Sequence, residues 1–229
     1  PEFDLIKTLS IDVPVNPDLK KSNWRKGILF KVEGLKLSPY QKTFFVDTDT
    51  FFCHDCQELF KLLDYYDLLI GHDPVDQKLI YNGDTLLEGY TPYNTGIIVF
   101  SNNTACTNLL EKWLDVYKEK FEEYPHDQAP FMEALLYSQI KIYALQSIYN
   151  FRFRFIVNAL PQEVKILHGR HAPFEEIANV LNSKLKQRVW IPHRFKCIVR
   201  QESSWLMEFY KKLPEPVQKK VAKMSRAFS

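Results

Sequence analysis

Apolar and polar residues follow one another along the chain in stretches of strand length and helix length. Short apolar runs bounded by turn residues predict five buried strands, at residues 43–46, 67–70, 93–100, 141–145 and 164–167. Apolar positions at helical spacing predict five helices, from Trp24 to Leu35, at 55–63, at 103–122, from His126, and from Phe174 to Lys186. Because the two kinds of element alternate, we predict an α/β fold with a mixed, mostly parallel sheet flanked by helices.

The segments between these elements carry turn and loop signals. Ser22 and Asn23 are typical helix N-cap residues and precede Trp24. Residues 73–93 contain proline, an Asn-Gly pair and polar residues without strong periodicity, which predicts an exposed loop of the kind that forms lids or faces an acceptor. Residues 3–6 alternate loosely and are predicted to form a strand.

Length and composition narrow the class of protein. The 229 residues suffice for one large α/β domain with a tail, and we predict a domain at 1–171 and a helical, basic extension at 172–229. A formal net charge of +2 argues against a nucleic-acid binder driven by bulk charge. Neither a GxGxxG nor a GxxxxGKS/T loop is present, which weakens dinucleotide and P-loop interpretations. There is neither a signal peptide nor an apolar run of ~18 residues, and the predicted location is the cytoplasm.

The predicted extension ends in an amphipathic helix within residues 204–224. Its polar side carries lysine and arginine, and its apolar side carries Trp205, Leu206, Phe209 and Tyr210. A basic helix of this kind can make a peripheral contact with an anionic membrane surface. The interpretation that we favour is a helix packed back on the domain with its charges in solvent.

Two acidic residues, Asp47 and Asp49, end the apolar run that begins at Thr43. Burying neighbouring carboxylates is unfavourable, because like charges raise each other's pKa. A hard divalent cation with diphosphate oxygens as further ligands would relieve that repulsion. The ends of strands in open α/β sheets are also where such folds bind ligands. The pair therefore predicts a metal and phosphate site.

Three more motifs lie at predicted strand ends or at a helix start, namely Asn94-Thr95-Gly96, His126-Asp127-Gln128 and His168-Gly169. Aspartate and histidine together suit Mn²⁺ better than Ca²⁺ or a structural Zn²⁺. Taken singly, each motif has an ordinary explanation, such as a helix cap for Asp127 or a satisfied core residue for His168. Lys31, on the first predicted helix, is a candidate cation for a donor phosphate, with a solvated lysine as the alternative. The ordered set is more specific than any one motif.

In this order the motifs resemble the Rossmann-like glycosyltransferase-A (GT-A) fold, in the style of the glycogenin-like and bacterial galactosyltransferase families. The matching text comprises Ser38-Pro39-Tyr40, Lys42 to Asp49, Asn94 to Phe100, His126 to Gln128 and Leu167 to Gly169. The resemblance covers roughly residues 1–171. It implies a hexosyl- or pentosyltransferase that moves a sugar from a nucleotide-diphosphate donor, such as a UDP-sugar, to a hydroxyl acceptor such as a glycan or lipid-linked glycan.

The resemblance also implies roles for single residues. Asp47, Asp49 and His168 would hold Mn²⁺ or Mg²⁺, which acts as a Lewis acid on the departing nucleoside diphosphate. The residues implied in binding the donor are Asp47, Lys31, Asn94, Gly96 and Gly169. Asp127 and Gln128 would be catalytic. Asp127 would be the base of an inverting reaction, whereas Gln128 near the anomeric carbon would suit a retaining one.

Two features depart from the family. The lysine that grips the phosphates after the histidine is missing, and Arg170 or His171 is the candidate replacement. The first strand and helix, which hold the nucleotide base in relatives, have no counterpart before residues 3–6, so we expect either that the chain lacks that unit or that the base is held differently. The rival interpretations are a metal-dependent phosphohydrolase with Asp47 as nucleophile or ligand, and a non-catalytic or truncated module that keeps the fold.

Overall fold

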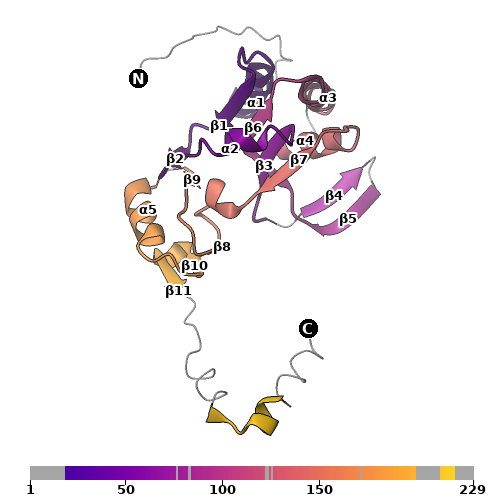
Figure 1. Cartoon of the computed structure of the whole chain (residues 1–229). Helices are drawn as coiled ribbons and strands as arrows, with labels where there is room; N and C mark the ends of the chain where they lie inside the picture. The colour runs from indigo at the N-terminus through magenta and orange to yellow at the C-terminus, as the bar shows by residue number, and fades with distance from the viewer. Residues whose placement is uncertain are drawn as a thin grey trace.

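A four-stranded sheet in the order β1-β6-β3-β7 forms the centre of the computed structural model (Figure 1). The strands are Lys42–Val46, Tyr93–Ser101, Leu68–His72 and Ile142–Leu145. β6 runs antiparallel to both of its neighbours, and only β3 and β7 are parallel. The sheet is mixed, as predicted, but the prediction of a mostly parallel sheet is wrong, because β6 inserts between β1 and β3 in the opposite direction. The described residues are 19–75, 77–81, 84–121, 124, 126–170, 172–199 and 212–219.

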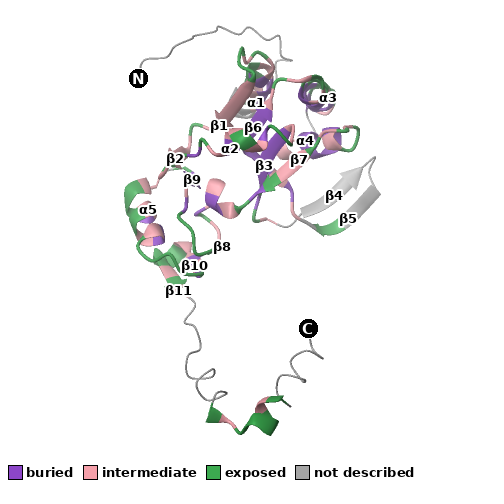
Figure 2. Cartoon of the chain, in the orientation of Figure 1, coloured by how far each residue is buried: buried purple, intermediate pink, exposed green. Residues whose placement is uncertain are grey.

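Helices cover both faces of this sheet, which confirms that part of the predicted fold class. Alternation along β3 sends Leu68 and Ile70 to one face and Leu69 to the other. The first face packs against α1 (Leu19–Lys36), α3 (Thr104–Glu119) and α4 (Gln128–Leu135), and the second against α2 (Leu59–Leu62). Figure 2 shows β3 and β6 largely buried between these layers. Each large apolar side chain buried here contributes about 1.5–3 kcal/mol.

Helix α1 starts earlier than predicted. It begins at Leu19, so Ser22 and Asn23 lie inside it and the predicted N-cap is wrong. Its buried positions, Ile28, Leu29, Val32 and Leu35, follow the expected spacing and face the sheet. Among the described residues, no helix is both apolar enough and long enough to cross a membrane.

Residues 73–93 do not form the predicted loop. They contain β4 (Gln77–Tyr81) and β5 (Asp84–Tyr90), which pair antiparallel as a hairpin. The sequence carries the signal for it, since Asn-Gly between two short runs favours a two-residue hairpin turn. The hairpin projects away from the central sheet (Figure 1).

A second core lies beyond the central sheet. It combines β8 (Val157–Ala159), β10 (Arg188–Ile191) and β11 (Lys196–Val199) with α5 (Phe174–Asn182). Residues before and after position 171 share this core, in which Trp190 packs with Phe151 and Phe153. The prediction of a helical extension is therefore wrong for residues 188–199, because β10 pairs with β8 and buries Trp190.

Several predictions fall on parts of the chain that the structure does not describe. The strand predicted at residues 3–6 lies outside the described residues. Most of the amphipathic helix predicted within 204–224 also lies outside them, and its contact with a membrane or with the domain stays a prediction. His171, one candidate for gripping phosphate, is likewise not described.

Candidate functional site

Two strand pairings and the backbone hydrogen bonds at their ends bring the predicted motifs to one place. The backbone N–H of Asp47 donates to the carbonyl of Gly96 at 2.8 Å, which places the end of β1 beside β6. β2 (Thr50–Phe52) pairs with β9 (Ile166–His168), and Thr50 lies opposite His168. The N–H of Gly169 then donates to the carbonyl of Asp49 at 2.9 Å. The chain therefore delivers its distant histidine directly beside the acidic pair.

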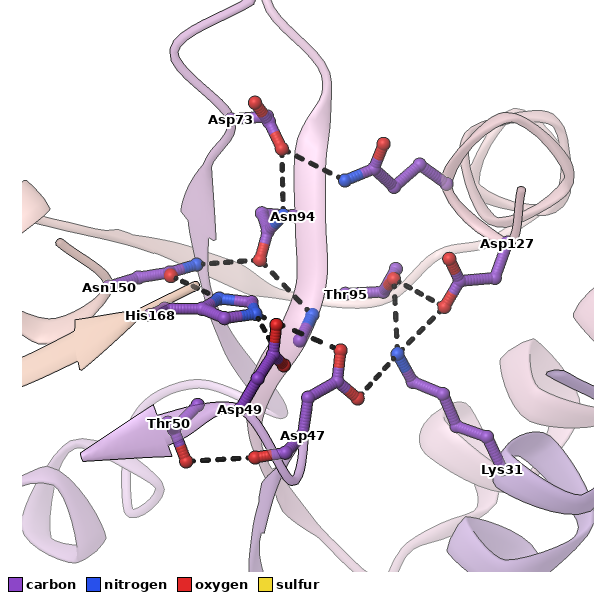
Figure 3. Close-up of polar contacts among 12 residues, drawn as sticks. Lys31, Asp47, Asp49, Thr50, Asp73, Asn94, Thr95, Asp127, Asn150 and His168 are labelled. Carbon is purple, nitrogen blue, oxygen red and sulfur yellow. Dashed lines mark hydrogen bonds and ion pairs between the residues drawn. The ribbon is translucent and has the colours of Figure 1, made fainter. Parts of the chain in front are cut away.

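The side chains of Asp47, Asp49 and His168 converge (Figure 3). Nε2 of His168 lies 3.4 Å from Oδ1 of Asp49 and 3.9 Å from Oδ2 of Asp47. One ligand atom from each residue lies within 4.8 Å of the others. Ligands about 2.1 Å from one octahedral ion are separated by roughly 3–4.2 Å, so these three groups fit a single small divalent cation. Two carboxylates and an imidazole are a donor set that Mn²⁺ accepts.

Gly96 is required by this packing. A Cβ built at position 96 would lie 2.1 Å from Cε1 of His168, 2.8 Å from its Nε2 and 2.9 Å from Oδ2 of Asp47. Gly169 is constrained as well, since its φ is +150° and a Cβ there would lie 2.9 Å from the Phe153 ring. The role implied for these glycines was contact with the donor, and the structure gives each an additional task in holding the site together.

Lys31 lies between two carboxylates. Its Nζ is 2.7 Å from Oδ2 of Asp127 and 3.1 Å from Oδ1 of Asp47, and only 12% of the side chain is exposed (Figure 3). The Thr95 hydroxyl donates to the same Asp127 oxygen at 2.7 Å. The predicted donor-binding lysine is thus at the site, where it neutralises the protein's own acids. Its ammonium also lies 5.2 Å from the centre of the Phe45 ring.

Asp127 is the N-cap residue of α4 but does not cap it. Its carboxylate makes no capping hydrogen bond and turns to Lys31 and Thr95 instead. The indole N–H of Trp113 donates to the Asp127 carbonyl at 3.0 Å and so fixes the start of the helix. The ordinary explanation of Asp127 as a helix cap is therefore wrong.

The pKa values of the two carboxylates beside Lys31 are shifted in opposite directions. Burial raises the pKa of Asp47, Lys31 opposes this, and the charges of Asp127 and Asp49 reinforce it. Burial also acts to raise the pKa of Asp127, but the Lys31 charge and the hydrogen bonds from Lys31 and Thr95 outweigh it and lower the pKa below its ordinary value. Asp127 therefore stays ionised and is a weak base.

His168 is neutral near pH 7. Burial, and then the charge of Arg152, lower the pKa of its imidazole to about 4. Its Nδ1 lies 2.9 Å from Oδ1 of Asn150, an acceptor, so Nδ1 carries the proton and Nε2 keeps a lone pair toward the acids. A neutral imidazole in this tautomer can bind a cation through Nε2.

A chain of amides leads from His168 to a second buried acid. Asn150 donates to Asn94 at 2.9 Å, and Asn94 donates to Oδ2 of Asp73 at 2.7 Å. Gln128 donates to the same oxygen at 3.0 Å. Asp73 is only 3% exposed, and its buried Oδ1 has no hydrogen-bond partner among the described residues. We call Asp73, Asn94, Asn150 and Gln128 the amide relay.

An open cavity of about 910 Å³ is lined by the acidic pair with His168, by Asp127, and by the relay residues other than Asn150. A smaller cavity of about 350 Å³ lies between α1 and the Asp47-Thr48-Asp49 turn, with Gly27, Ile28 and Phe45 in its wall. Both cavities share the carboxylates of Asp47, Asp49 and Asp127. The acids therefore stand where an elongated ligand would pass from one cavity to the other.

Two arginines complete the larger cavity. The NH1 group of Arg152 lies 3.2 Å and 3.3 Å from the two ring nitrogens of His168, and its NH2 group lies 3.8 Å from Oδ2 of Asp73. Nε of Arg170 lies 3.6 Å from Oδ2 of Asp49, and Arg170 borders both cavities. Arg170, one of the two candidates for gripping phosphate, is thus at the site.

The predicted site residues all line or border these cavities. Those brought together are Asp47, Asp49, His168, Lys31, Asn94, Gly96, Asp127, Gln128 and Gly169. The residues that the sequence did not indicate are Asp73, Asn150 and Arg152. Asp73 directly follows β3, so the strand-end signal that selected Asp47 would have selected it too.

Comparison with protein families decides the kinship of the chain. Residues 41–171, more than half of the chain, match the family model described as nucleotide-diphospho-sugar transferase. The chain belongs to this family. The resemblance predicted from the motifs is thereby confirmed. Among curated protein sequences, none matches this nucleotide-diphospho-sugar transferase.

Solved structures give weaker similarities to this family member. Mouse xyloside xylosyltransferase 1 is 17% identical over 68% of the chain and 66% of that protein, with a TM-score of 0.44. The glycosyltransferase GlyE of Streptococcus pneumoniae is 18% identical over 61% of the chain and 36% of that protein, with a TM-score of 0.39. The chain thus spans about two thirds of the first and little more than a third of the second. At these scores we assign no property of either protein to the chain.

Proposed function

We propose that this protein transfers a sugar from a nucleotide-diphosphate donor, a UDP-sugar, to a hydroxyl group of a glycan or lipid-linked glycan. Family membership supports the donor class. The observation that carries the proposal is the convergence of Asp47, Asp49 and His168 at the junction of two cavities. The cation held there is Mn²⁺ or Mg²⁺, because both accept carboxylate ligands and diphosphate oxygens.

The donor lies across the junction. Its diphosphate occupies the space beside Asp47, Asp49 and His168, where a bound cation supplies charge neutralisation to the departing nucleoside diphosphate. The nucleoside enters the smaller cavity, whose wall includes the apolar side chains of Ile28 and Phe45. The sugar enters the larger cavity, which offers hydrogen-bonding groups.

Asp73 and Gln128 bind the sugar hydroxyls. Asp73 presents a buried oxygen without a partner, and a sugar hydroxyl is the kind of donor that would satisfy it. Gln128 lines the same cavity and is already fixed on Asp73. Asp127 suits a different task from general base. Its lowered pKa and its bonds to Lys31 and Thr95 favour a fixed negative charge that positions Lys31 near the diphosphate.

Calorimetry tests this function directly. UDP-sugars are titrated into the protein with and without Mn²⁺, and then into Asp49→Ala, with Asp115→Ala on the exposed side of α3 as the matched control. We expect Mn²⁺-dependent binding in the unchanged protein and in the control, and its loss in Asp49→Ala. Hydrolysis of simple phosphomonoesters would instead support a phosphohydrolase. If the protein neither binds UDP-sugars nor hydrolyses phosphomonoesters, the result would support a non-catalytic module.

A further inference from the structure

We propose that Asn150 is a positioning residue. It fixes His168 in the tautomer that leaves Nε2 open to a cation, and through the same amide group it holds the carboxylate of Asp73. The identity of the cation and of the sugar rests on the proposed function, but the tautomer does not. Asn150 thus connects His168, at one end of the larger cavity, with Asp73 at the other end through Asn94.

The direction of each hydrogen bond follows from one backbone group. The N–H of Gly96 can only donate, and it donates to Oδ1 of Asn94 at 3.2 Å. Because that oxygen is an acceptor, Asn150 must present its Nδ2 group to it, at 2.9 Å. Oδ1 of Asn150 is then the atom that faces His168, so Nδ1 of the imidazole must carry the proton. The tautomer is therefore set by the backbone of β6.

The backbone around Asn150 holds the amide in place. Asn150 follows the short helix η1 (Ser147–Tyr149), and only 2% of the residue is exposed. The next residue, Phe151, donates to the Ile166 carbonyl at 2.9 Å and accepts from the N–H of His168 at 3.0 Å. On its other side Asn150 packs against Gly71, where an added Cβ would lie 3.1 Å from that of Asn150. The amide has no room to turn away from His168.

The other end of the relay shapes the acid. Asn94 and Gln128 both donate to Oδ2 of Asp73, at 2.7 Å and 3.0 Å. With Oδ2 occupied twice, the carboxylate is locked and Oδ1 is the oxygen left without a partner. The Gly96 N–H sets the orientation of Asn94, and Asn150, bonded to the same oxygen, connects that arrangement to His168.

The first experiment measures the tautomer in metal-free protein. Nitrogen NMR of His168 at pH 7 is compared between the unchanged protein, Asn150→Leu, and Asn158→Leu on the exposed side of β8. We expect the Nδ1–H tautomer in the unchanged protein and in Asn158→Leu, and a mixture or the Nε2–H tautomer in Asn150→Leu. Mn²⁺ affinity should fall about 10- to 100-fold in Asn150→Leu, as for other groups that orient metal ligands. An unaltered tautomer in Asn150→Leu would overturn the proposal.

The second experiment reverses one bond of the relay. The side chain in Asn150→Asp still accepts the hydrogen bond from His168, so the tautomer should be unchanged. The Mn²⁺ affinity should stay within about threefold of the original. The second oxygen of that side chain faces Oδ1 of Asn94, however, and this repulsion favours a turned amide that gives up its bond from the Gly96 N–H and presents oxygen to Asp73. Adding Asp73→Asn supplies a donor there, so the melting temperature of the double variant should exceed that of Asn150→Asp alone. Strictly additive losses would contradict the relay.

The two proposals fail in different ways. If the unchanged protein does not bind Mn²⁺ at all, the proposed function is overturned, while the tautomer measurement still decides the role of Asn150. If Mn²⁺ binds but Asn150→Leu changes neither the tautomer nor the affinity, the positioning role is overturned and the function stands.

Discussion

The two ends of the larger cavity stabilise buried polar groups by different means. At the cation end, Asp47 and Asp49 face each other and His168, and their neighbours are the charges of Lys31 and Arg170. At the relay end, neutral amides satisfy one oxygen of Asp73, while the other is buried and has no hydrogen-bond partner among the described residues. One end relies on charge and the other on hydrogen bonds with a fixed direction.

This difference teaches what each end is ready to bind. Like charges within 4.8 Å repel by about 3 kcal/mol at an effective dielectric of 20, before solvent screening, so the cation end gains from any ion that removes the repulsion. The relay is already oriented, so a hydroxyl that reaches the buried oxygen of Asp73 meets an acceptor of fixed direction. The predictions below separate the two ends, in order of expected effect.

Asp49→Asn should have the largest effect, because it removes one charged ligand and keeps the shape. We expect Mn²⁺ affinity to fall on the order of 100-fold or more, which exceeds the usual effect of groups that only orient ligands. Titration calorimetry measures the affinity. Melting curves give a second reading, since Mn²⁺ at 100 times its Kd stabilises by about 2.7 kcal/mol and should no longer do so. Asp115→Asn is the control. Equal Mn²⁺ affinities in the two variants would show that Asp49 does not bind the cation.

Gly96→Ala should damage both ends, because the added methyl group overlaps the imidazole of His168 within a central strand. Overpacking of this kind costs about 1–3 kcal/mol of unfolding free energy, and here it also displaces a metal ligand. Urea unfolding measures the stability and calorimetry the Mn²⁺ affinity. Gly34→Ala is the matched control, since a Cβ there meets nothing within 4 Å and should stabilise α1 by about 0.5–1 kcal/mol. A stable Gly96→Ala with full affinity would contradict the packing described.

Lys31→Met removes the ammonium between Asp127 and Asp47 and keeps the length of the side chain. We expect a loss of about 2 kcal/mol at pH 7, below the 3–5 kcal/mol of a fully buried pair because Asp47 is one third exposed. Lys36→Met, on the same helix, removes an ion pair of 3.8 Å with Glu33 and should cost less than about 0.5 kcal/mol.

The pH dependence of Lys31→Met gives the sign of the interaction. The lowered pKa of Asp127 means that its stabilisation is present above pH ~4, the ordinary carboxyl pKa, and is lost as pH falls through the folded-state pKa. Without Lys31, burial raises the pKa of Asp127 above its ordinary value, so the ionised carboxylate destabilises the folded protein at pH 7. The difference in unfolding free energy between the unchanged protein and Lys31→Met should therefore be smaller at pH 3.5 than at pH 7. A difference that does not narrow would show that Lys31 acts through packing alone.

The sequence predicted the cation end because its signal is local. Asp47 and Asp49 end an apolar strand, where two neighbouring carboxylates repel each other unless a positive charge is near. In the relay, Asn94 and Gln128 lie in predicted motifs, whereas Asp73 and Asn150 were missed. Asn150 acquires its meaning only when β9 brings His168 beside it, and Asp73 lies in a Gly-His-Asp-Pro stretch that has the composition of a turn. A polar residue in a recognisable motif can be predicted even when its partners are distant, as His168 was, whereas the role of Asn150 depends on a distant pairing that no motif marks.

The same division holds for the fold. The existence and type of α3 followed from the spacing of Leu110, Trp113 and Tyr117, which is a local property. The direction of β6 depends on which strands pair, and apolar runs do not encode that. Arg188 lies in the predicted basic extension, but its guanidinium donates to the carbonyls of residues 160, 162 and 186 and the residue is buried.

Thr95→Val should have the smallest effect and tests how far charge outweighs hydrogen bonding at the cation end. The hydroxyl donates to Asp127 at 2.7 Å, and losing one such bond costs about 1 kcal/mol. Urea unfolding of Thr95→Val, alone and with Asp127→Asn, isolates this bond, because the cost should shrink once the carboxylate is gone. If Thr95→Val cost as much as Lys31→Met, the hydroxyl would be what holds Asp127, and both ends of the cavity would rest on directed hydrogen bonds.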